Sequence, residues 1–273
     1  MQKKIFIYLI SLISAQEVES YNFVLKYKDG EENKYSTDFL MNMAVPGMGD
    51  MQLGRSVATF EKYLGTIDGL AVIEEKITTM IATTKFGDDV SPDYDLNAVV
   101  GVPYKVFIKD SGEIDHIETE QRHLEETLNA LKRDAGQNNY FFPFGENAKN
   151  ISIGDSWTEK KDSIVFYTGE GDIESLMFSD SKYTLKKIKI KKGRRIAYIN
   201  EVVQMRAELN FLQGGMFFEG TMSGESKYSY RFDIDTGKVL LRKGSGKMDY
   251  AFQMEDNSLR SVMYLSEKTK KVK

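Results

Sequence analysis

Residues 200–211 read NEVVQMRAELNF, and apolar and polar side chains alternate along them with a period of two. The apolar members are Val203, Met205, Ala207, Leu209 and Phe211. A period of two puts the two kinds of side chain on opposite faces of a β-strand. This stretch therefore predicts a strand with one face on a core and the other in water.

The same pattern continues on both sides of this stretch. SKYSYRFDI (226–234) alternates in the same way and ends at Asp235-Thr236-Gly237, where glycine supplies the positive φ of a tight hairpin. Residues 183–199 alternate likewise and turn at Lys192-Gly193. Residues 73–84, IEEKITTMIATT, fit a helix or a strand, but their Ile and Thr content favours a strand. The fold class is thus mainly β, with long antiparallel strands.

Three short segments of the first half of the chain resemble segments of the second half, in the same order and at nearly the same separation in residue number. This regularity indicates an internal duplication. The matching segments are KYKDGEENKY (26–35) with IGDSWTE (153–159), LAVIEE (70–75) with IAYINE (196–201), and FIKDSGEI (107–114) with FDIDTGKV (232–239). Chance similarity between hairpins of equal length is the alternative. The repeat predicts two β-meander modules, 16–143 and 144–273, in a curved sheet or half-barrel. Whether they form one barrel or two domains is left open by the sequence.

Between the modules, residues 119–135 have the period of a helix. Leu124, Leu128 and Leu131 form an apolar stripe, and Phe141 and Phe142 follow in the aromatic connector. A single amphipathic helix needs a surface that covers its stripe. We expect this helix to lie across the concave face of the sheet.

The chain begins with MQKK, nine apolar residues at 5–13, and SAQ. A short positive segment before an apolar run predicts a signal peptide over residues 1–15 and an exported protein. The alternative is a buried N-terminal strand. No later stretch is long and apolar enough for a transmembrane helix.

The amino-acid composition limits the kinds of catalytic and binding sites that this protein can form. There is no Cys, and His116 and His123 are the two histidines, so thiol catalysis and Ser-His-Asp triads have little support. The net charge of −4 argues against nucleic acid as a partner. We predict no catalytic residue, no metal and no cofactor. Residues 93–97 have the D-x-D-x-N spacing of a calcium loop, but the pattern fails beyond it, so calcium binding by loop 88–97 stays open.

A basic run occupies residues 182–195 and holds eight lysine and arginine side chains. An outer face or edge kept soluble and protected from pairing is the common explanation for such a run. An anionic lipid surface or another polyanion is the alternative.

Methionine and phenylalanine gather near two glycine-containing turns, and such flexible thioethers beside aromatic rings suit a deformable apolar pocket. Ordinary core packing explains them equally well. With the helix stripe and the connector, the candidate ligand-binding residues are Met41, Met43, Leu124, Leu128, Leu131, Phe141, Phe142, Phe211, Met216 and Phe217.

The arrangement resembles an uncharacterised family of exported bacterial β-rich proteins. The resemblance rests on the leader, on Lys28-Asp29-Gly30-Glu31, on IGDSWTE (153–159) and on YSYRFDIDTGKV (228–239). It covers nearly the whole mature chain and implies no established activity. At fold level alone, the long strands with one covering helix also resemble half-barrel lipoprotein carriers of the LolA/LolB type, which hold acyl chains in an apolar cavity.

These observations favour an exported, non-enzymatic β-protein, periplasmic, in the cell envelope or extracellular, that binds an apolar or amphipathic ligand, such as a hydrophobic small molecule or lipid. The alternatives are an envelope scaffold for protein partners and, third, a hydrolase that uses paired carboxylates.

Overall fold

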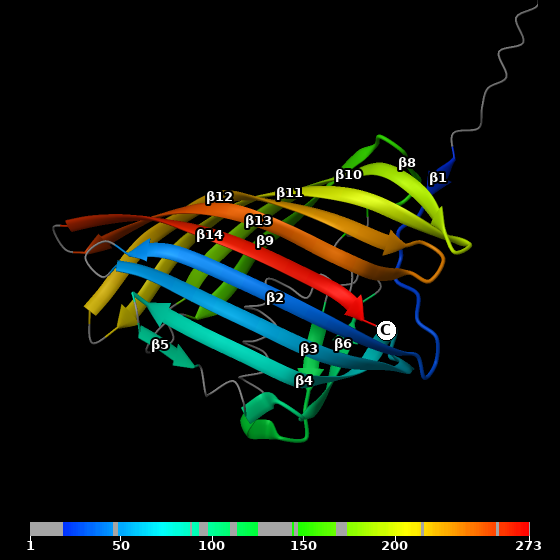
Figure 1. The fold of residues 1–273 in the computed structure, drawn as a ribbon, viewed down its shortest axis with the longest axis horizontal. Helices are drawn as coiled ribbons and strands as arrows, with labels where there is room; N and C mark the ends of the chain where they lie inside the picture. The colour runs from blue at the N-terminus through cyan, green and yellow to red at the C-terminus, as the bar shows by residue number, and fades with distance from the viewer. Residues whose placement is uncertain are drawn as a thin grey trace, which may run out of the picture.

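The computed structural model shows a large, strongly curved antiparallel β-sheet (Figure 1). The structure describes residues 19–45, 49–87, 89–92, 98–109, 114–124, 144, 147–167, 174–213, 216–254 and 257–272. The predicted signal peptide lies outside these residues. No helix among them is long and apolar enough to cross a membrane.

The described strands of the first half of the chain are β1 (Ser20–Tyr21), β2 (Glu32–Val45), β3 (Gly49–Ile67), β4 (Leu70–Phe86), β5 (Asp89–Pro92), β6 (Pro103–Ile108) and β7 (Ile114–Glu118). Those of the second half are β8 (Ile151–Ser152), β9 (Ser156–Tyr167), β10 (Glu174–Lys191), β11 (Arg194–Gln213), β12 (Met216–Asp233), β13 (Lys238–Met254) and β14 (Asn257–Val272). The mainly β prediction is confirmed.

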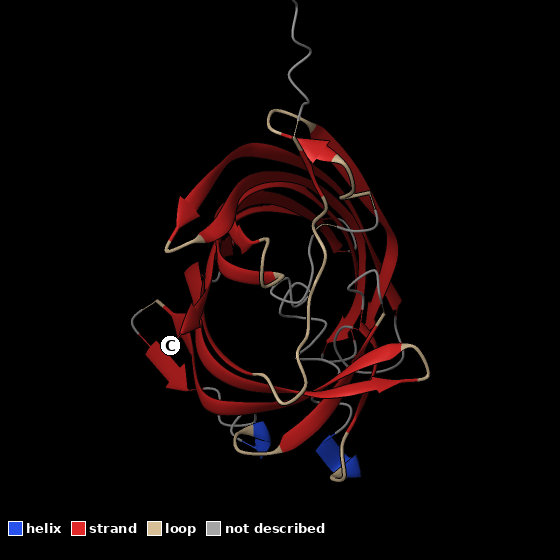
Figure 2. Ribbon diagram, turned by 90° about the vertical axis from the view of Figure 1, so that its right-hand side faces the viewer, coloured by secondary structure: helices blue, strands red, loops and turns tan. Residues whose placement is uncertain are grey.

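The strands follow the order β7-β6-β4-β3-β2-β14-β13-β12-β11-β10-β9, with β5 on β4 and a separate β1–β8 pair. The last strand of the chain, β14, pairs with β2 from Met263–Met43 to Val272–Lys34, so one sheet runs through both halves. Viewed from its end, the sheet curls round without β7 and β9 pairing (Figure 2). It is a curved open sheet and not a closed barrel.

Alternation of side chains divides the sheet into two faces, as predicted. In β11, Val203, Ala207 and Leu209 are buried, whereas Gln204 and Glu208 are exposed. Burial on one face follows from the curl, because the concave face turns toward the interior of the molecule and the convex face toward water. Segment 73–84 lies in β4, so its assignment as a strand is also confirmed.

Two tight turns have the same backbone conformation. Asp68 and Gly69 join β3 to β4 with φ of 50° and 81°, and Lys192 and Gly193 join β10 to β11 with φ of 51° and 77°. Two successive positive φ values match the twist of the flanking strands, and glycine adopts the second without strain.

The predicted helix over 119–135 is not formed where the structure describes its start. Arg122–Leu124 is a single 3-10 turn, and Thr119 Oγ1 accepts a hydrogen bond from the Gln121 amide. A side-chain bond of this kind offers the backbone an alternative to the helix. Residues 125–135 lie outside the described residues.

One end of the concave face is filled by aromatic rings. Trp157 of β9 stacks on Phe23 at 5.8 Å and on Tyr183 at 5.4 Å between ring centroids. Its Nε1 donates a hydrogen bond to the Phe144 carbonyl at 3.0 Å. These contacts bring an edge strand, the N-terminal segment and the connector into one core.

The N-terminal segment crosses this end of the curled sheet (Figure 2). Phe23 packs in the aromatic core of the second half, whereas Leu25 and Tyr27 pack against the core formed by β4, β6 and β7. The Gly30 amide then bonds to the Tyr63 carbonyl of β3 at 3.2 Å. The segment therefore ties the two halves of the sheet together across the opening.

Each half contains a buried tyrosine–glutamate hydrogen bond at an equivalent position. Tyr104 of β6 donates to Glu75 of β4, and Tyr230 of β12 donates to Glu201 of β11. The partners are 29 residues apart in both pairs. Residues 75 and 201, like 104 and 230, are separated by the 126-residue offset found between LAVIEE and IAYINE. The boundaries of the two modules stay a prediction.

We predict that Trp157→Ala lowers the free energy of unfolding by about 3–5 kcal/mol, because it removes a buried ring with two stacking partners. Chemical denaturation measures this loss. Trp157→Phe, which keeps an aromatic ring but not the hydrogen bond, should lose less than half as much. A loss below about 1 kcal/mol for the alanine variant would place the ring outside the core.

Candidate functional site

The other end of the concave face carries a methionine cluster. It spans six neighbouring strands, β2 and β10–β14, and seven of its twelve members are methionines. The members are Met41, Met43, Met177, Met205, Ala207, Leu209, Met222, Met248, Tyr250, Phe252, Met263 and Leu265. We call this set the methionine cluster.

Cross-strand register brings these side chains together. On the β14–β2 pair, Met263 lies opposite Met43 and Leu265 lies opposite Met41. Residues directly opposite in an antiparallel pair share a face, so the ends of the two halves contribute to one surface. The two strands are more than 200 residues apart along the chain.

A glycine makes room for one of the thioethers. Gly224 of β12 lies opposite Met248 of β13. A Cβ atom at Gly224 would come within 2.6 Å of the Met248 Sδ and 2.1 Å of the Lys247 carbonyl oxygen. Any side chain at Gly224 would displace Met248, so this glycine is needed for the close approach.

The cluster combines buried and accessible side chains. Five members are buried, and the other seven, including Met41 and Met43, are half-buried. Tyr250 directs its hydroxyl to the Met263 Sδ at 3.5 Å, and burial raises the pKa of Tyr250 to about 12. Unbranched thioethers adjust to different shapes at small cost, so this surface suits an apolar guest of irregular form.

A belt of buried polar groups lies between the methionine cluster and the aromatic end, although Met205 packs against both. Arg242 of β13 donates from Nε to the Tyr230 hydroxyl at 3.0 Å and pairs with Glu267 of β14. Tyr230 donates to Glu201 at 2.5 Å, and its pKa is raised by burial and by the Glu201 charge. The Arg242 guanidinium also lies 3.8 Å from the centroid of the Tyr228 ring. Each charged group of this belt thus has a partner, as burial requires.

A second ion-pair group lies nearer the N-terminal segment. Lys238 pairs with Glu31 at 3.3 Å and lies 4.3 Å from the centroid of the Tyr27 ring. Burial lowers the pKa of Lys238, and the Glu31 charge opposes that shift. Lys271 approaches the same carboxylate at 3.9 Å. These pairs hold the N-terminal segment against β13 and β14.

The structure brings together only some of the residues predicted from sequence. Met41 and Met43 lie in the methionine cluster, whereas Leu124 packs in the core of β4, β6 and β7. Phe211 is in β11, and Met216 and Phe217 are in β12, but their side chains lie outside the described part of the chain. Leu128, Leu131, Phe141 and Phe142 also lie outside it.

Five methionines of the cluster were not proposed as binding residues from sequence: Met177, Met205, Met222, Met248 and Met263. Two features of the sequence could have pointed to them. The chain contains 13 methionines, and these five occupy apolar positions of strands in which apolar and polar residues alternate.

No group of three or more His, Cys, Asp or Glu side chains suited to a metal ion occurs among the residues that the structure describes. Residues 93–97, which have the spacing of a calcium loop, lie outside the described residues, so calcium binding by loop 88–97 stays open.

No protein-family model matches this chain, and no curated protein matches it in sequence. The resemblance to an exported uncharacterised family therefore stays a prediction. A solved structure concerned with lipid–protein interactions in lipovitellin is similar, with a TM-score of 0.50 and 13% sequence identity. The match covers 91% of this chain and 26% of the lipovitellin chain, so this protein spans about a quarter of its length.

Two further solved structures are less similar. The β domain of the Bordetella autotransporter BrkA has a TM-score of 0.23 at 10% identity, and covers 89% of this chain and 99% of that chain. Pseudomonas aeruginosa OccK5 (OpdH) has a TM-score of 0.27 at 6% identity, with 92% and 100% covered. We draw no argument from these two.

The buried belt gives a stability prediction. Tyr230→Phe removes a hydroxyl that serves both Arg242 and Glu201, so it should lower the free energy of unfolding by about 2–3 kcal/mol. Tyr104→Phe removes a bond to Glu75 and should lower it by about 1–2 kcal/mol. Urea denaturation of both variants and the parent protein compares the two losses. Equal losses would show that the contact of Tyr230 with Arg242 contributes nothing.

Proposed function

We propose that this protein is an exported, non-enzymatic binding protein that holds an apolar or amphipathic ligand, such as a lipid, against its methionine cluster. The observation that carries the proposal is the gathering of seven methionines, four of them half-buried, on the concave face of one continuous sheet.

The side chains of the methionine cluster favour contact with an apolar ligand. The cluster offers thioethers and aromatic rings with very few polar atoms, and contact with them removes apolar surface of the guest from water. The curvature of the sheet lets six strands contact one molecule from several sides. The charged groups of the polar belt offer an acyl chain no apolar contact, which limits how far the chain extends toward the aromatic end.

The fold similarity to lipovitellin gives independent support. At 13% identity the likeness concerns the fold alone, and that structure is described as one of lipid–protein interactions in lipovitellin. A curved sheet with an apolar concave face is a chemical basis for binding the same class of ligand here.

A pair of neighbouring residues on opposite faces tests the proposal. Met41 lies in the cluster, whereas Leu40 on the convex face is 37% exposed. Met41→Gln should weaken binding of the fluorescent fatty acid cis-parinaric acid about tenfold, because it places an amide against the acyl chain. Leu40→Gln, the matched control, should leave binding unchanged.

Fluorescence titration measures both affinities, and thermal unfolding checks that both variants fold. If the parent protein fails to bind cis-parinaric acid and carries no lipid when purified, the proposed function is wrong. Equal weakening by the two variants would move the ligand away from the methionine cluster.

Export has its own test. Expression of the full chain in a bacterial host should give a mature protein that begins at Gln16, because the leader would be cleaved after Ala15. Mass spectrometry of the periplasmic fraction identifies the N-terminus. Recovery of the uncleaved chain in the cytoplasm alone would contradict export.

A further inference from the structure

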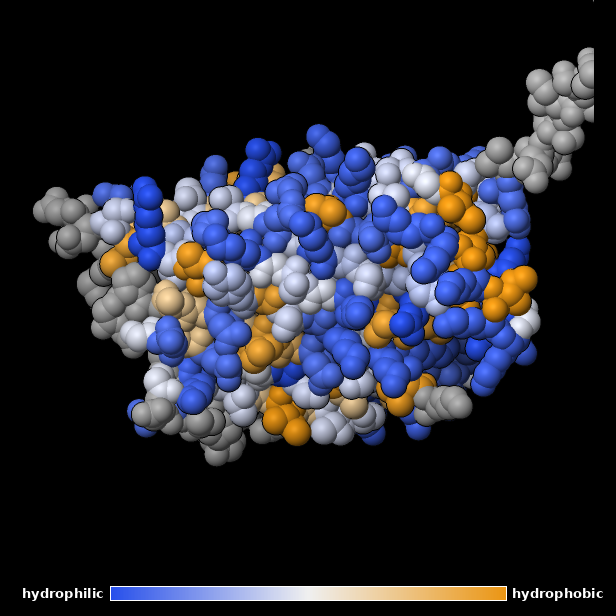
Figure 3. Space-filling view, turned by 45° about the horizontal axis from the view of Figure 1, so that its top comes forward, coloured by the Kyte–Doolittle hydropathy of each residue, from blue (hydrophilic) through white to orange (hydrophobic). Residues whose placement is uncertain are grey.

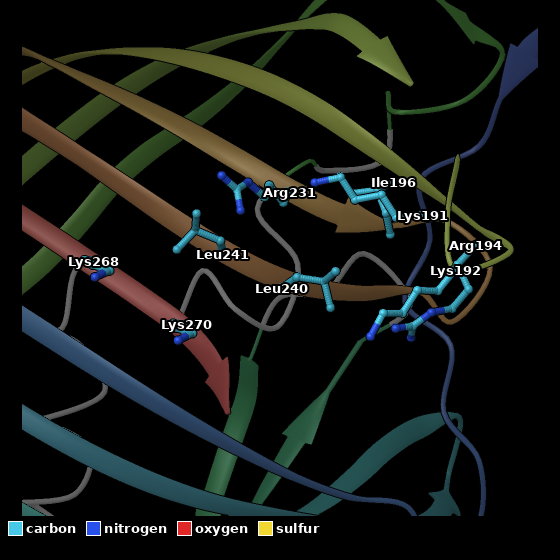
Figure 4. A pocket seen from close by; sticks show the side chains of 9 residues that line it. All are labelled: Lys191, Lys192, Arg194, Ile196, Arg231, Leu240, Leu241, Lys268 and Lys270. Atoms are coloured by element: carbon cyan, nitrogen blue, oxygen red, sulfur yellow. The ribbon is translucent and has the colours of Figure 1, made fainter. Parts of the chain in front are cut away.

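A basic groove lies on the convex face, away from the methionine cluster. It has a volume of about 480 Å³ and is lined by residues from five strands and one turn (Figure 4). The lining residues are Lys191, Lys192, Arg194, Ile196, Arg231, Leu240, Leu241, Lys268 and Lys270. We call this site the basic groove. Six of its nine residues are cationic, and the other three are aliphatic.

Register explains why cations from distant parts of the chain meet here. One row across the sheet runs from Lys187 through Tyr198, Arg231 and Leu241 to Lys270. Neighbouring strands are about 4.8 Å apart, so the four steps of this row span about 19 Å. The row therefore extends the basic groove across β10–β14.

Four cations surround one ring at the side of the groove. The Nζ atoms of Lys187, Lys189 and Lys191 lie 5.2, 5.9 and 5.6 Å from the centroid of the Tyr198 ring. The Arg231 guanidinium lies 5.9 Å from the same centroid. A hydrogen bond from Lys191, together with these charges, lowers the pKa of Tyr198. The ring partly offsets the repulsion between the four cations but does not neutralise it.

Carboxylates near the groove pair with only one of its cations. Asp233, fully buried, pairs with Arg194 of the groove at 2.8 Å, and Asp235 pairs with Arg195 outside it at 2.7 Å. Asp38 lies opposite Lys268 in the register and accepts a hydrogen bond from Ser56, which leaves its negative charge in place. Among the residues that the structure describes, no ion pair is formed by the other five cations of the groove: Lys191, Lys192, Arg231, Lys268 and Lys270.

Protection of a sheet edge explains only part of this pattern. Lys187, Lys189 and Lys191 lie on the part of β10 beyond its pairing with β9, where edge protection would place charge. Arg231 and Lys270 lie on β12 and β14, which are paired on both sides. The net charge of the chain is −4, so the concentration of unpaired positive charge on this face is a strong local asymmetry.

We propose that the basic groove docks the protein onto an anionic lipid bilayer. A row about 19 Å long matches a surface with many anionic headgroups better than one small anion. Within the groove, the Leu240 and Leu241 side chains are half-buried, and orange apolar groups lie among blue polar ones at this end of the molecule (Figure 3). Accessible aliphatic groups next to lysines suit the boundary between headgroups and acyl chains.

Vesicle sedimentation tests the proposal with the full chain. The protein should pellet with vesicles of phosphatidylcholine containing 30% phosphatidylglycerol, but not with phosphatidylcholine alone, and added NaCl should weaken the binding. The variant Lys268→Glu/Lys270→Glu should reduce the partition coefficient by about tenfold or more. Arg231→Gln, a milder change on another strand, should reduce it several-fold.

Lys227→Glu/Lys247→Glu is the matched control. It makes the same change in net charge on the convex face, but these lysines lie outside the groove and pair with Glu225 and Asp249. The control should bind nearly as well as the parent protein, and circular dichroism checks that all variants fold.

The proposal would be overturned by no binding to the anionic vesicles, by equal loss in the groove and control variants, or by release from vesicles by millimolar inorganic phosphate at constant ionic strength. The last would assign the groove to a free phosphate group. Tighter binding to a DNA oligonucleotide than to the vesicles would likewise make it a polyanion site and refute a bilayer partner.

Discussion

The pairing of β14 with β2 is the interaction on which the rest of this structure depends. Ten residue pairs join the last strand of the chain to the first strand of the large sheet. Without them the two halves would be separate sheets, each with two exposed edges. With them, the concave face is continuous, and Met41 and Met43 meet Met263 and Leu265. The closure entropy of so long a loop is balanced by the backbone hydrogen bonds and the apolar contacts along the pair.

The continuous concave face has zones with different chemistry, in addition to the apolar core of β4, β6 and β7. Aromatic rings around Trp157 fill one end, a belt of paired charges around Arg242 follows, and the methionine cluster occupies the other end. Rigid, fully packed rings give stability, and hydrogen-bonded charges fix the register of neighbouring strands. Flexible thioethers also bury apolar area in the core, and their ability to adapt to guests of different shape is the reason for placing the proposed ligand in this zone.

The two faces of the same strands support different proposals. In β14, Leu265 faces the methionine cluster, whereas Lys268 and Lys270 face the basic groove. A period of two permits this because successive side chains point to opposite sides. A ligand held inside and a bilayer bound outside would then be linked through strands that both sites share. A rigid sheet connects them without requiring a conformational change.

The sequence by itself determined the local structure. Alternation over 200–211, turn residues such as Lys192-Gly193 and the Ile and Thr content of 73–84 predicted strands and hairpins that the structure confirms, because these features act between near neighbours in the chain. The sequence also pointed to Met41 and Met43. Only the tertiary structure decided that β14 pairs with β2, which five other methionines join them, and that Lys270 lies in one row with Lys187. Register between distant strands depends on side-chain packing over a whole face of the sheet, and no short stretch of sequence contains that information.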